Sequence, residues 1–373
     1  MSNLKKIKDK IEKAGVVGAG GAGFPSHIKI LENIDTILIN GVECEPLLKT
    51  DFHLIKTYKK ELFEALNSLC DDLNIKSGVI AIKKHTAELL NIKDGENDKK
   101  AGFKIVKDIY PAGDEIVLIK EALGKNVPAG NLPSSVSVVV FNVETLLNIK
   151  NALSDIPVTE KYLTIGGNTD KAYVIKVPIG TPVLYIFERL GIFVPENNLV
   201  LDGGPMMGKI INHKTAVITK TTKGLLIIDK NTFCIRQKLT NLGSAVNRAA
   251  GSCCGCRMCT DMCPRYLMGY PIEPHKILQA FPKTSENKTH KGAFYCSGCG
   301  VCEAIACPQN ISPNKLFANI KSKLIKDEIK PERYEYSNPL SVREYRKIPA
   351  SRIVDRLGIR KYYREEFDYI EVK

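Results

Sequence analysis

The stretch GSCCGCRMCTDMCP, residues 251–264, decides the architecture of the C-terminal part of this 373-residue chain. It places cysteines at positions 253, 256, 259 and 263, and a proline follows the last of them. The spacing C-x2-C-x2-C-x3-C-P lets three thiolates wrap one face of a [4Fe-4S] cubane while the fourth reaches a neighbouring cluster. The stretch therefore predicts a domain that holds two iron–sulfur clusters and moves electrons one at a time.

A second stretch, CSGCGVCEAIACP at residues 296–308, repeats the pattern with one extra residue before its last cysteine. Because the fourth cysteine of such a run ligates the other cluster, we expect the two runs to exchange their last ligands. The predicted ligands are Cys253, Cys256, Cys259 and Cys307 for the first cluster, and Cys263, Cys296, Cys299 and Cys302 for the second. Cys254 could replace its neighbour Cys253, although the register of the run favours Cys253.

Structural zinc is the alternative for such a segment, since zinc also binds four thiolates. Zinc ribbons use two C-x2-C pairs separated by a spacer, whereas three of these cysteines follow one another at two-residue gaps.

Neither a secretory signal nor an apolar run of about 18 residues is apparent, so we expect no transmembrane segment and a cytoplasmic protein. In that reducing compartment, twelve cysteines favour metal binding over disulfides.

The formal net charge of +13 raises the question of nucleic-acid binding. Two oxidised clusters on eight thiolates would together add about −4. Lysines are scattered along the chain, and no arginine-rich run with interleaved aromatic residues follows the pattern of a nucleic-acid groove. We therefore expect no nucleic-acid partner.

A glycine-rich loop, GAGGAG at residues 18–23, satisfies the pattern G-x-G-x-x-G. A Rossmann dinucleotide fold would need a buried strand before this loop, but the preceding residues KIKDKIEKA are typical of a charged helix. The glycines still allow backbone N–H groups to approach a phosphate or a flat ring. A simple glycine turn is the alternative interpretation.

From Thr36 to about Asn151 the sequence alternates short apolar runs with helical patterns, which favours the α/β fold class. We predict strands over 36–40, 78–82, 103–106 and 136–141, and helices over 51–69, 114–123 and 143–153, the last capped by Asn142. Past about residue 157, β-branched residues broken by glycine and proline predict a mostly β domain, interrupted by one helix over 182–190. After residue 312 a charged helical tail is expected to run to the end.

Four segments carry a family resemblance: residues 20–25 (GGAGFP) with Lys29, residues 40–46 (NGVECEP), residues 110–115 (YPAGDE) and residues 142–145 (NVET). They resemble the FMN- and NADH-binding segments of the complex I flavoprotein subunit. They resemble still more closely the RnfC/PduS-like family, which contains the C subunits of Rnf-type electron transport complexes and the propanediol-utilisation cobalamin reductases. This similarity runs nearly end to end, although we expect the chain to lack the lipoyl-like barrel of such proteins.

The resemblance implies four segments and a set of cofactor ligands. We expect an FMN/NADH-binding, complex I flavoprotein-like α/β domain over 1–156 and a soluble-ligand-binding β-grasp (SLBB) domain over 157–240. An α-helical ferredoxin-like domain with two [4Fe-4S] clusters would cover 241–325, and a charged C-terminal tail 326–373. The residues implied for the flavin phosphate are Gly20, Gly21, Gly23 and Lys29; for the rest of the flavin, Glu43, Asn142 and Thr145; and for NADH, Glu45 and Glu115.

The function implied is NADH oxidation through FMN, followed by single-electron steps through both clusters. No acid–base dyad or nucleophile is required. The expected acceptor is cobalamin or an electron acceptor protein. The alternatives are an electron-input subunit of a membrane or amino-acid reductase complex, peripheral to a membrane or microcompartment, and a binding module with degenerate sites.

Overall fold

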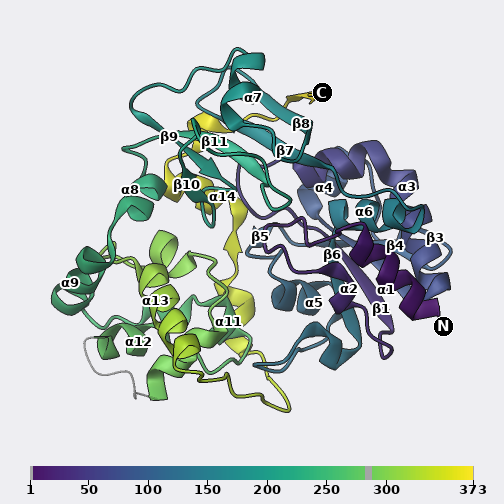
Figure 1. The fold of residues 1–373 in the computed structure, drawn as a ribbon. Coiled ribbons are helices and arrows are strands. Elements are labelled where there is room, and N and C mark those ends of the chain that lie inside the picture. Colours follow the sequence, from purple (N-terminus) through teal and green to yellow (C-terminus); the bar gives the residue numbers. More distant parts are fainter. Residues whose placement is uncertain (1–2, 282–287, 373) are drawn as a thin grey trace.

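The computed structural model describes residues 3–281 and 288–372, so the end points 1 and 373 of the expected domains lie outside the described residues. Three units surround a common centre, with the β-rich unit above, the N-terminal unit to the right and the cysteine-rich helices to the lower left (Figure 1). Within the described residues, no helix is both long and apolar enough to cross a bilayer.

The N-terminal unit is built on a five-stranded sheet in the order β3-β4-β2-β1-β6. Its strands are β1 (Thr36–Gly41), β2 (Ser77–Lys83), β3 (Asn97–Asp98), β4 (Ala101–Val106) and β6 (Val138–Asn142). The four longer strands are parallel, and β3 is an antiparallel edge. The four strands predicted from apolar runs are confirmed, because buried parallel strands are nearly continuous in their apolar residues.

Alternate residues of β1, which lies between β2 and β6, face two different cores. Ile37 and Ile39 pack with α1 (Asn3–Lys13), α3 (Thr50–Asp72) and α6 (Val143–Leu153). Leu38 packs with α5 (Glu115–Leu123) in a core that continues into the cysteine-rich segment. The two short helices of this unit are α2 (Ser26–Lys29) and α4 (Lys84–Leu89). The sheet is therefore covered by α1, α3 and α6 on one face. Helix α5 and part of the cysteine-rich unit cover the other face.

Helix boundaries in this unit follow local chemistry. The Asn142 side chain accepts the Glu144 N–H at 3.0 Å and so caps α6, as predicted. Gly124, with φ of 70°, ends α5 in the left-handed conformation. The expected helix before the glycine loop is α1, which confirms that the loop does not follow a strand.

The β-rich unit contains a six-stranded sheet in the order β10-β9-β11-β7-β8-β13. Its strands are β7 (Glu160–Gly167), β8 (Ala172–Pro178), β9 (Asn198–Asp202), β10 (Lys209–Ile211), β11 (Gly224–Asp229) and β13 (Phe367–Glu371). The predicted interrupting helix is α7 (Val183–Arg189), whose Val183, Ile186 and Phe187 are buried against this sheet.

The C-terminal tail corrects one expectation, because it is not helical to its end. Beyond α13 (Pro313–Lys326) the chain forms β12 (Ile348–Pro349), which pairs with β5 (Ile109–Tyr110), then α14 (Ala350–Leu357) and β13. Strand β13 pairs in parallel with β8, and its Tyr369 ring stacks on buried His53 of α3 with centroids 4.4 Å apart. Backbone pairing with β8 and aromatic contacts with α3 thus join the tail to both other units.

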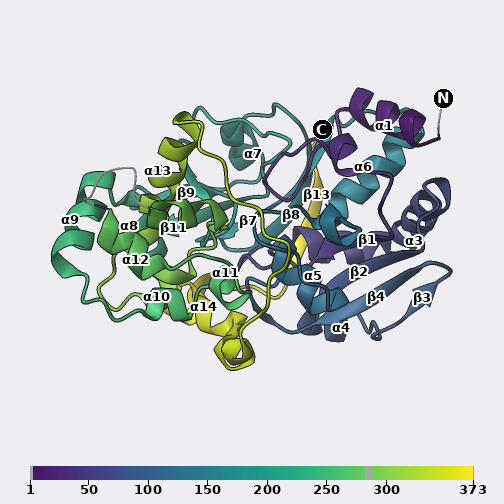
Figure 2. The same ribbon diagram turned by 90° about the horizontal axis from the view of Figure 1, so that it is seen from below.

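The cysteine-rich unit consists of short helices, which lie at the left of Figure 2. They are α8 (Phe233–Leu239), α9 (Leu242–Ser252), α10 (Met258–Asp261), α11 (Pro264–Leu267), α12 (Pro274–Ala280) and α13, with a 3-10 helix over Lys288–Tyr295 and a π-helical turn over Cys302–Ala306. Further 3-10 turns elsewhere in the chain are Pro133–Val136, Ser341–Arg346 and Arg360–Tyr362. The helices between the cysteine runs bring both runs into one core.

Candidate functional site

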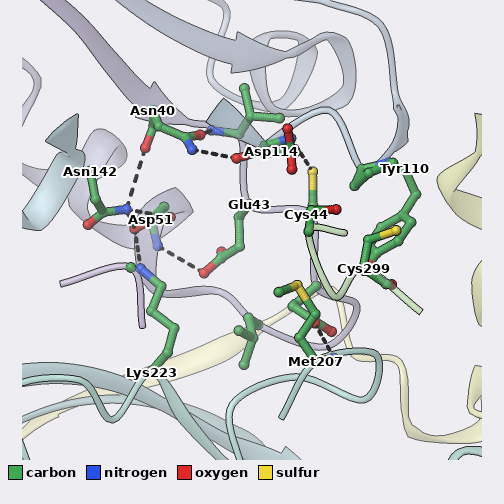
Figure 3. Close-up of a pocket in the computed structure, with 17 residues that line it drawn as sticks. Asn40, Glu43, Cys44, Asp51, Tyr110, Asp114, Asn142, Met207, Lys223 and Cys299 are labelled. Carbon is green, nitrogen blue, oxygen red and sulfur yellow. Dashed lines mark hydrogen bonds and ion pairs between the residues drawn. The ribbon is translucent and has the colours of Figure 1, made fainter. Parts of the chain in front are cut away.

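A cavity of about 230 Å³ lies where the three units meet (Figure 3). It opens at the carboxyl ends of the parallel strands β1 and β6, marked by Asn40 and Asn142, where open α/β sheets bind their ligands. The N-terminal unit supplies most of the lining. The β-rich unit adds Met207 and Lys223, and the second cysteine run adds Cys299.

The glycine loop lines this cavity with Gly20, and the neighbouring Ala19 is hydrogen-bonded to the protein on both its N–H and its carbonyl. The Ala19 N–H donates to Oγ1 of buried Thr145 at 3.0 Å, and the Ala19 carbonyl accepts from the Lys161 ammonium at 3.4 Å. In the described part of the chain, the N–H groups of residues 20–22 donate to no protein acceptor. A loop with a fixed base and free N–H groups fits a flavin phosphate.

The conformation of the loop depends on Gly23. Its φ of 65° is in the left-handed region, and a Cβ there would lie 2.8 Å from the Thr221 methyl carbon of the β-rich unit. A larger residue would therefore be strained and would also push the two units apart. Gly23 is therefore required by the turn and by the contact between the units, and its predicted role on the flavin phosphate stays a prediction.

Glu43 and Asp51 form the acidic side of the cavity. Asp51 accepts two 3.1 Å bonds from the Asn142 side-chain amide, and its carboxylate lies 2.5 Å from the Lys223 ammonium. Glu43 accepts the Asp51 N–H at 3.3 Å. Burial, and then the Asp51 charge, raises the pKa of Glu43 to about 7. Glu43 thus lies beside the ion pair of Asp51 and Lys223, with its pKa raised toward neutral pH.

Glu45 is clamped by the β-rich unit. Its two carboxylate oxygens accept the N–H groups of Met206 and Met207 at 2.9 and 2.6 Å. Burial raises the pKa of Glu45 although these bonds favour its ionised form. A Cβ at Gly204 would clash with a Glu45 carboxylate oxygen, so the glycine allows this close approach.

The cavity brings together four of the residues implied by the resemblance, namely Gly20, Glu43, Glu45 and Asn142. Gly21, Gly23 and Thr145 belong to the loop and its support. Lys29 and Glu115 form an ion pair at 2.5 Å, and the Lys29 ammonium also donates to the Val140 carbonyl at 3.2 Å. Neither lies in the cavity lining. Their predicted roles on the flavin phosphate and on NADH stay predictions.

The eight predicted cluster cysteines gather in two neighbourhoods. As free thiols, Cys259 has a pKa raised to about 12 by burial and then by the nearby sulfurs of Cys307, Cys253 and Cys256. Burial also raises the pKa of Cys263 to about 12, and there the nearby thiol is Cys296. The pKa of Cys302 is raised by burial, by Glu303 and by the sulfurs of Cys296, Cys299 and Cys263. These neighbours support the two predicted ligand sets.

Within residues 3–281 and 288–372, no three His, Cys, Asp or Glu side chains converge closely enough to hold a single metal ion. In a cubane each thiolate binds a different iron, so its cysteines stand farther apart than the ligands of one zinc ion. Cys254, the alternative to Cys253, is exposed.

The second ligand set adjoins the cavity. Cys299 lines it, and the Cys299 carbonyl accepts the hydroxyl of buried Tyr110 at 2.7 Å. Asp114, another lining residue, pairs at 2.8 Å with Arg265, which is two residues beyond Cys263. Figure 3 shows Glu43 between the Asp51–Lys223 pair on one side and Cys44 and Cys299 on the other. A ligand in the cavity would therefore lie beside the second cluster.

Comparisons with known proteins agree with this arrangement. Residues 11–151 match the Nuo51 FMN-binding domain, and residues 252–312 match a 4Fe-4S dicluster domain. The chain is 35% identical over 378 residues to "Cobalamin reductase PduS" of Citrobacter freundii, covering 98% of this chain and 83% of that protein. The chain belongs to the PduS family. It is an oxidoreductase with FMN and [4Fe-4S] clusters, which confirms the resemblance seen in the sequence.

This PduS-family chain is also related to components of larger electron-transfer complexes. It is 30% identical over 289 residues to the C subunit of the Na(+)-translocating ferredoxin:NAD(+) oxidoreductase complex of Acetobacterium woodii, covering 75% of this chain and 62% of that protein. An NAD+-reducing [NiFe]-hydrogenase in its H2-reduced state superposes with a TM-score of 0.55 over 92% of this chain and 65% of that chain, at 16% identity. That likeness shows a shared fold. The β-grasp (SLBB) assignment of the β-rich unit stays a prediction.

Sequence reasoning missed Asp51 and Lys223. Asp51 had a usable signal, since an acidic residue in the first turn of a helix directly after the NGVECEP segment points back toward the strand ends. Lys223 had no sequence signal, because it lines the cavity from a unit that is remote in sequence from the other lining residues.

Proposed function

We propose that this protein oxidises NADH and passes the electrons through FMN and two [4Fe-4S] clusters to cobalamin. The observation that carries the proposal is the shared wall of the cavity, in which Cys299 of the second ligand set lines the same space as Gly20, Glu43 and Asn142. Bound FMN supplies the chemistry that accepts two electrons together and releases them singly. The name of the PduS relatives supports cobalamin as the acceptor.

The residues of this chain bind and orient the reactants. The free N–H groups of the glycine loop bind the flavin phosphate, with Lys29 as a charge nearby, and Asn142 fixes the flavin from the end of β6. Glu45 and Glu115 hold the nicotinamide nucleotide. The Met206–Met207 loop and the second cysteine run cover the cavity and keep solvent and oxygen from it.

The cluster order follows from exposure. Cys299 lines the cavity, so a cluster held by Cys263, Cys296, Cys299 and Cys302 would be the one placed to accept electrons from a bound flavin. In the other set, Cys256 is exposed, as is the neighbouring Cys254. A cluster held by Cys253, Cys256, Cys259 and Cys307 would therefore supply the exit for electrons, at a face that an acceptor can reach. We infer a cytoplasmic site of action, because cysteines that are not joined in disulfides are typical of a reducing compartment.

The experiment is anaerobic reduction of cob(III)alamin by the reconstituted protein. Each NADH should reduce two cob(III)alamin to cob(II)alamin, forming NAD+ and one proton. The second candidate, an electron-input component of a larger complex, is favoured by the relation to the Acetobacterium woodii ferredoxin:NAD(+) oxidoreductase complex. NADH-dependent reduction of ferredoxin or of an artificial acceptor, with no reduction of cobalamin, would support that candidate and contradict the first.

A further inference from the structure

Lys223 is a buried cation that the β-rich unit supplies to the flavin cavity. It directly precedes β11, and its side chain is 10% exposed. Its ammonium lies 2.5 Å from an Asp51 oxygen of α3 and lines the cavity. Figure 3 shows Lys223 and Asn142 both pointing toward Asp51. The cavity thus carries a positive charge that does not belong to the FMN-binding domain.

The hydrogen bonds of this ammonium are incomplete. A lysine ammonium has three N–H donors. Within the described residues, that of Lys223 donates to Asp51 alone. Asp51 is further satisfied by the two bonds from Asn142, so it does not depend on Lys223 for partners. The Lys223 side chain is 10% exposed and lines the cavity, so its remaining donors are available to a ligand with acceptor atoms or negative charge.

The neighbouring buried lysine makes the contrast clear. Lys161 of β7 pairs with Glu144 and also donates to the Ala19 carbonyl, so its donors serve the protein framework. Lys161 does not line the cavity. Burial alone would lower the pKa of Lys223, but Asp51, Glu43 and Glu144 raise it above its ordinary value. Lys223 therefore stays charged beside the ligand.

We propose that Lys223 is a flavin-site residue contributed by the β-rich unit, and that its charge favours the reduced flavin over the oxidised flavin. A hydride from NADH brings two electrons and one proton, and the flavin gains one negative charge as NADH becomes NAD+. An ammonium in the same cavity stabilises that charge in surroundings of low dielectric. The β-rich unit then takes part in the redox site and is more than a spacer.

The proposal rests on FMN occupancy, and its test needs neither NADH nor cobalamin. The flavin midpoint potential is measured by anaerobic spectroelectrochemistry in Lys223→Met, Lys223→Arg and the double variant Asp51→Asn with Lys223→Met. Lys171→Met, an exposed lysine of the same sheet unit, is the matched control. Lys223→Met should bind reduced flavin at least tenfold more weakly relative to oxidised flavin, which lowers a two-electron potential by about 30 mV. Lys223→Arg should keep the wild-type potential.

The double variant separates a flavin-site role from a counter-ion role. Removing both members of a buried pair is often neutral for stability, so this variant should fold even where Lys223→Met alone does not. A lowered potential in the double variant supports the proposal, as does selective loss of FMN from folded Lys223→Met. A wild-type potential in folded Lys223→Met would show that the lysine charge does not act on the flavin. A lowered potential in Lys223→Met that returns to the wild-type value in the double variant would show that Lys223 only neutralises Asp51. Either result would overturn the proposal. If the protein failed to reduce cobalamin, the flavin potentials of these variants would still test the role of Lys223, because their measurement uses no cobalamin.

Discussion

Thr145→Val tests how the flavin loop is held. The Thr145 side chain is fully buried, and its hydroxyl accepts the N–H of Ala19, which is 2% exposed. Valine has nearly the same shape but no acceptor, so the variant leaves a buried N–H without a partner. Such a group costs about 1–3 kcal/mol. If the loop keeps its position, the cost appears in the free energy of unfolding; if the loop moves, it appears in FMN affinity.

The assay for this prediction has two parts. FMN binding to the apoprotein is followed by quenching of flavin fluorescence, and the free energy of unfolding is taken from urea titrations of the same preparation. The two losses together should reach about 1–3 kcal/mol, and a loss expressed wholly in binding would weaken FMN about 5- to 150-fold. Thr145→Ser keeps the hydroxyl and is the control. Wild-type values for Thr145→Val, or an equal loss in Thr145→Ser, would refute the reasoning.

Three further predictions concern the clusters, the acidic turn and NADH. Cys307→Ser should reduce the iron content from about eight to about four per chain, whereas Cys254→Ser should leave it unchanged, since only Cys307 is a predicted ligand; iron and sulfide analysis checks this. The pKa of Glu43 is about 7 in the folded state and about 4.5 as the ordinary value. Ionising Glu43 therefore destabilises the fold as pH rises from about 4.5 to about 7, and Glu43→Gln should lack that part of the pH dependence of the unfolding free energy in urea. Glu115→Ala should slow flavin reduction by NADH but not cluster reduction by dithionite, because its partly exposed pair with Lys29 contributes little to stability; equal loss of both would show a structural role.

Much of the fold could be predicted from local signals. The run around Ile37, Leu38 and Ile39 is apolar on both faces because both faces of β1 are buried, and sequence alone shows this. The cap at Asn142 depends on residues only two positions away. Strand β13 escaped prediction because its stability comes from pairing with β8 and from stacking on His53, and neither partner is near it in sequence.

In the candidate site, too, some residues could be predicted from the sequence, whereas other contacts are apparent only in the folded chain. The resemblance identified Glu43, Glu45 and Asn142, which lie on segments that end strands of the N-terminal sheet and meet in one cavity. It also identified Thr145, but the contact of its hydroxyl with the Ala19 N–H could be read only from the folded chain. Lys223 was missed, because nothing in its own segment indicates that the β-rich unit covers the flavin cavity.

The most direct test of the central claim is the cofactor content of anaerobically purified protein and its response to NADH. We predict one FMN with about eight iron and eight sulfide per chain, and flavin absorbance together with a broad iron–sulfur shoulder. Both features should bleach when NADH is added. Colourless protein with stoichiometric zinc, or a flavin that NADH reduces while the clusters stay oxidised, would contradict an electron path from NADH through FMN to the clusters.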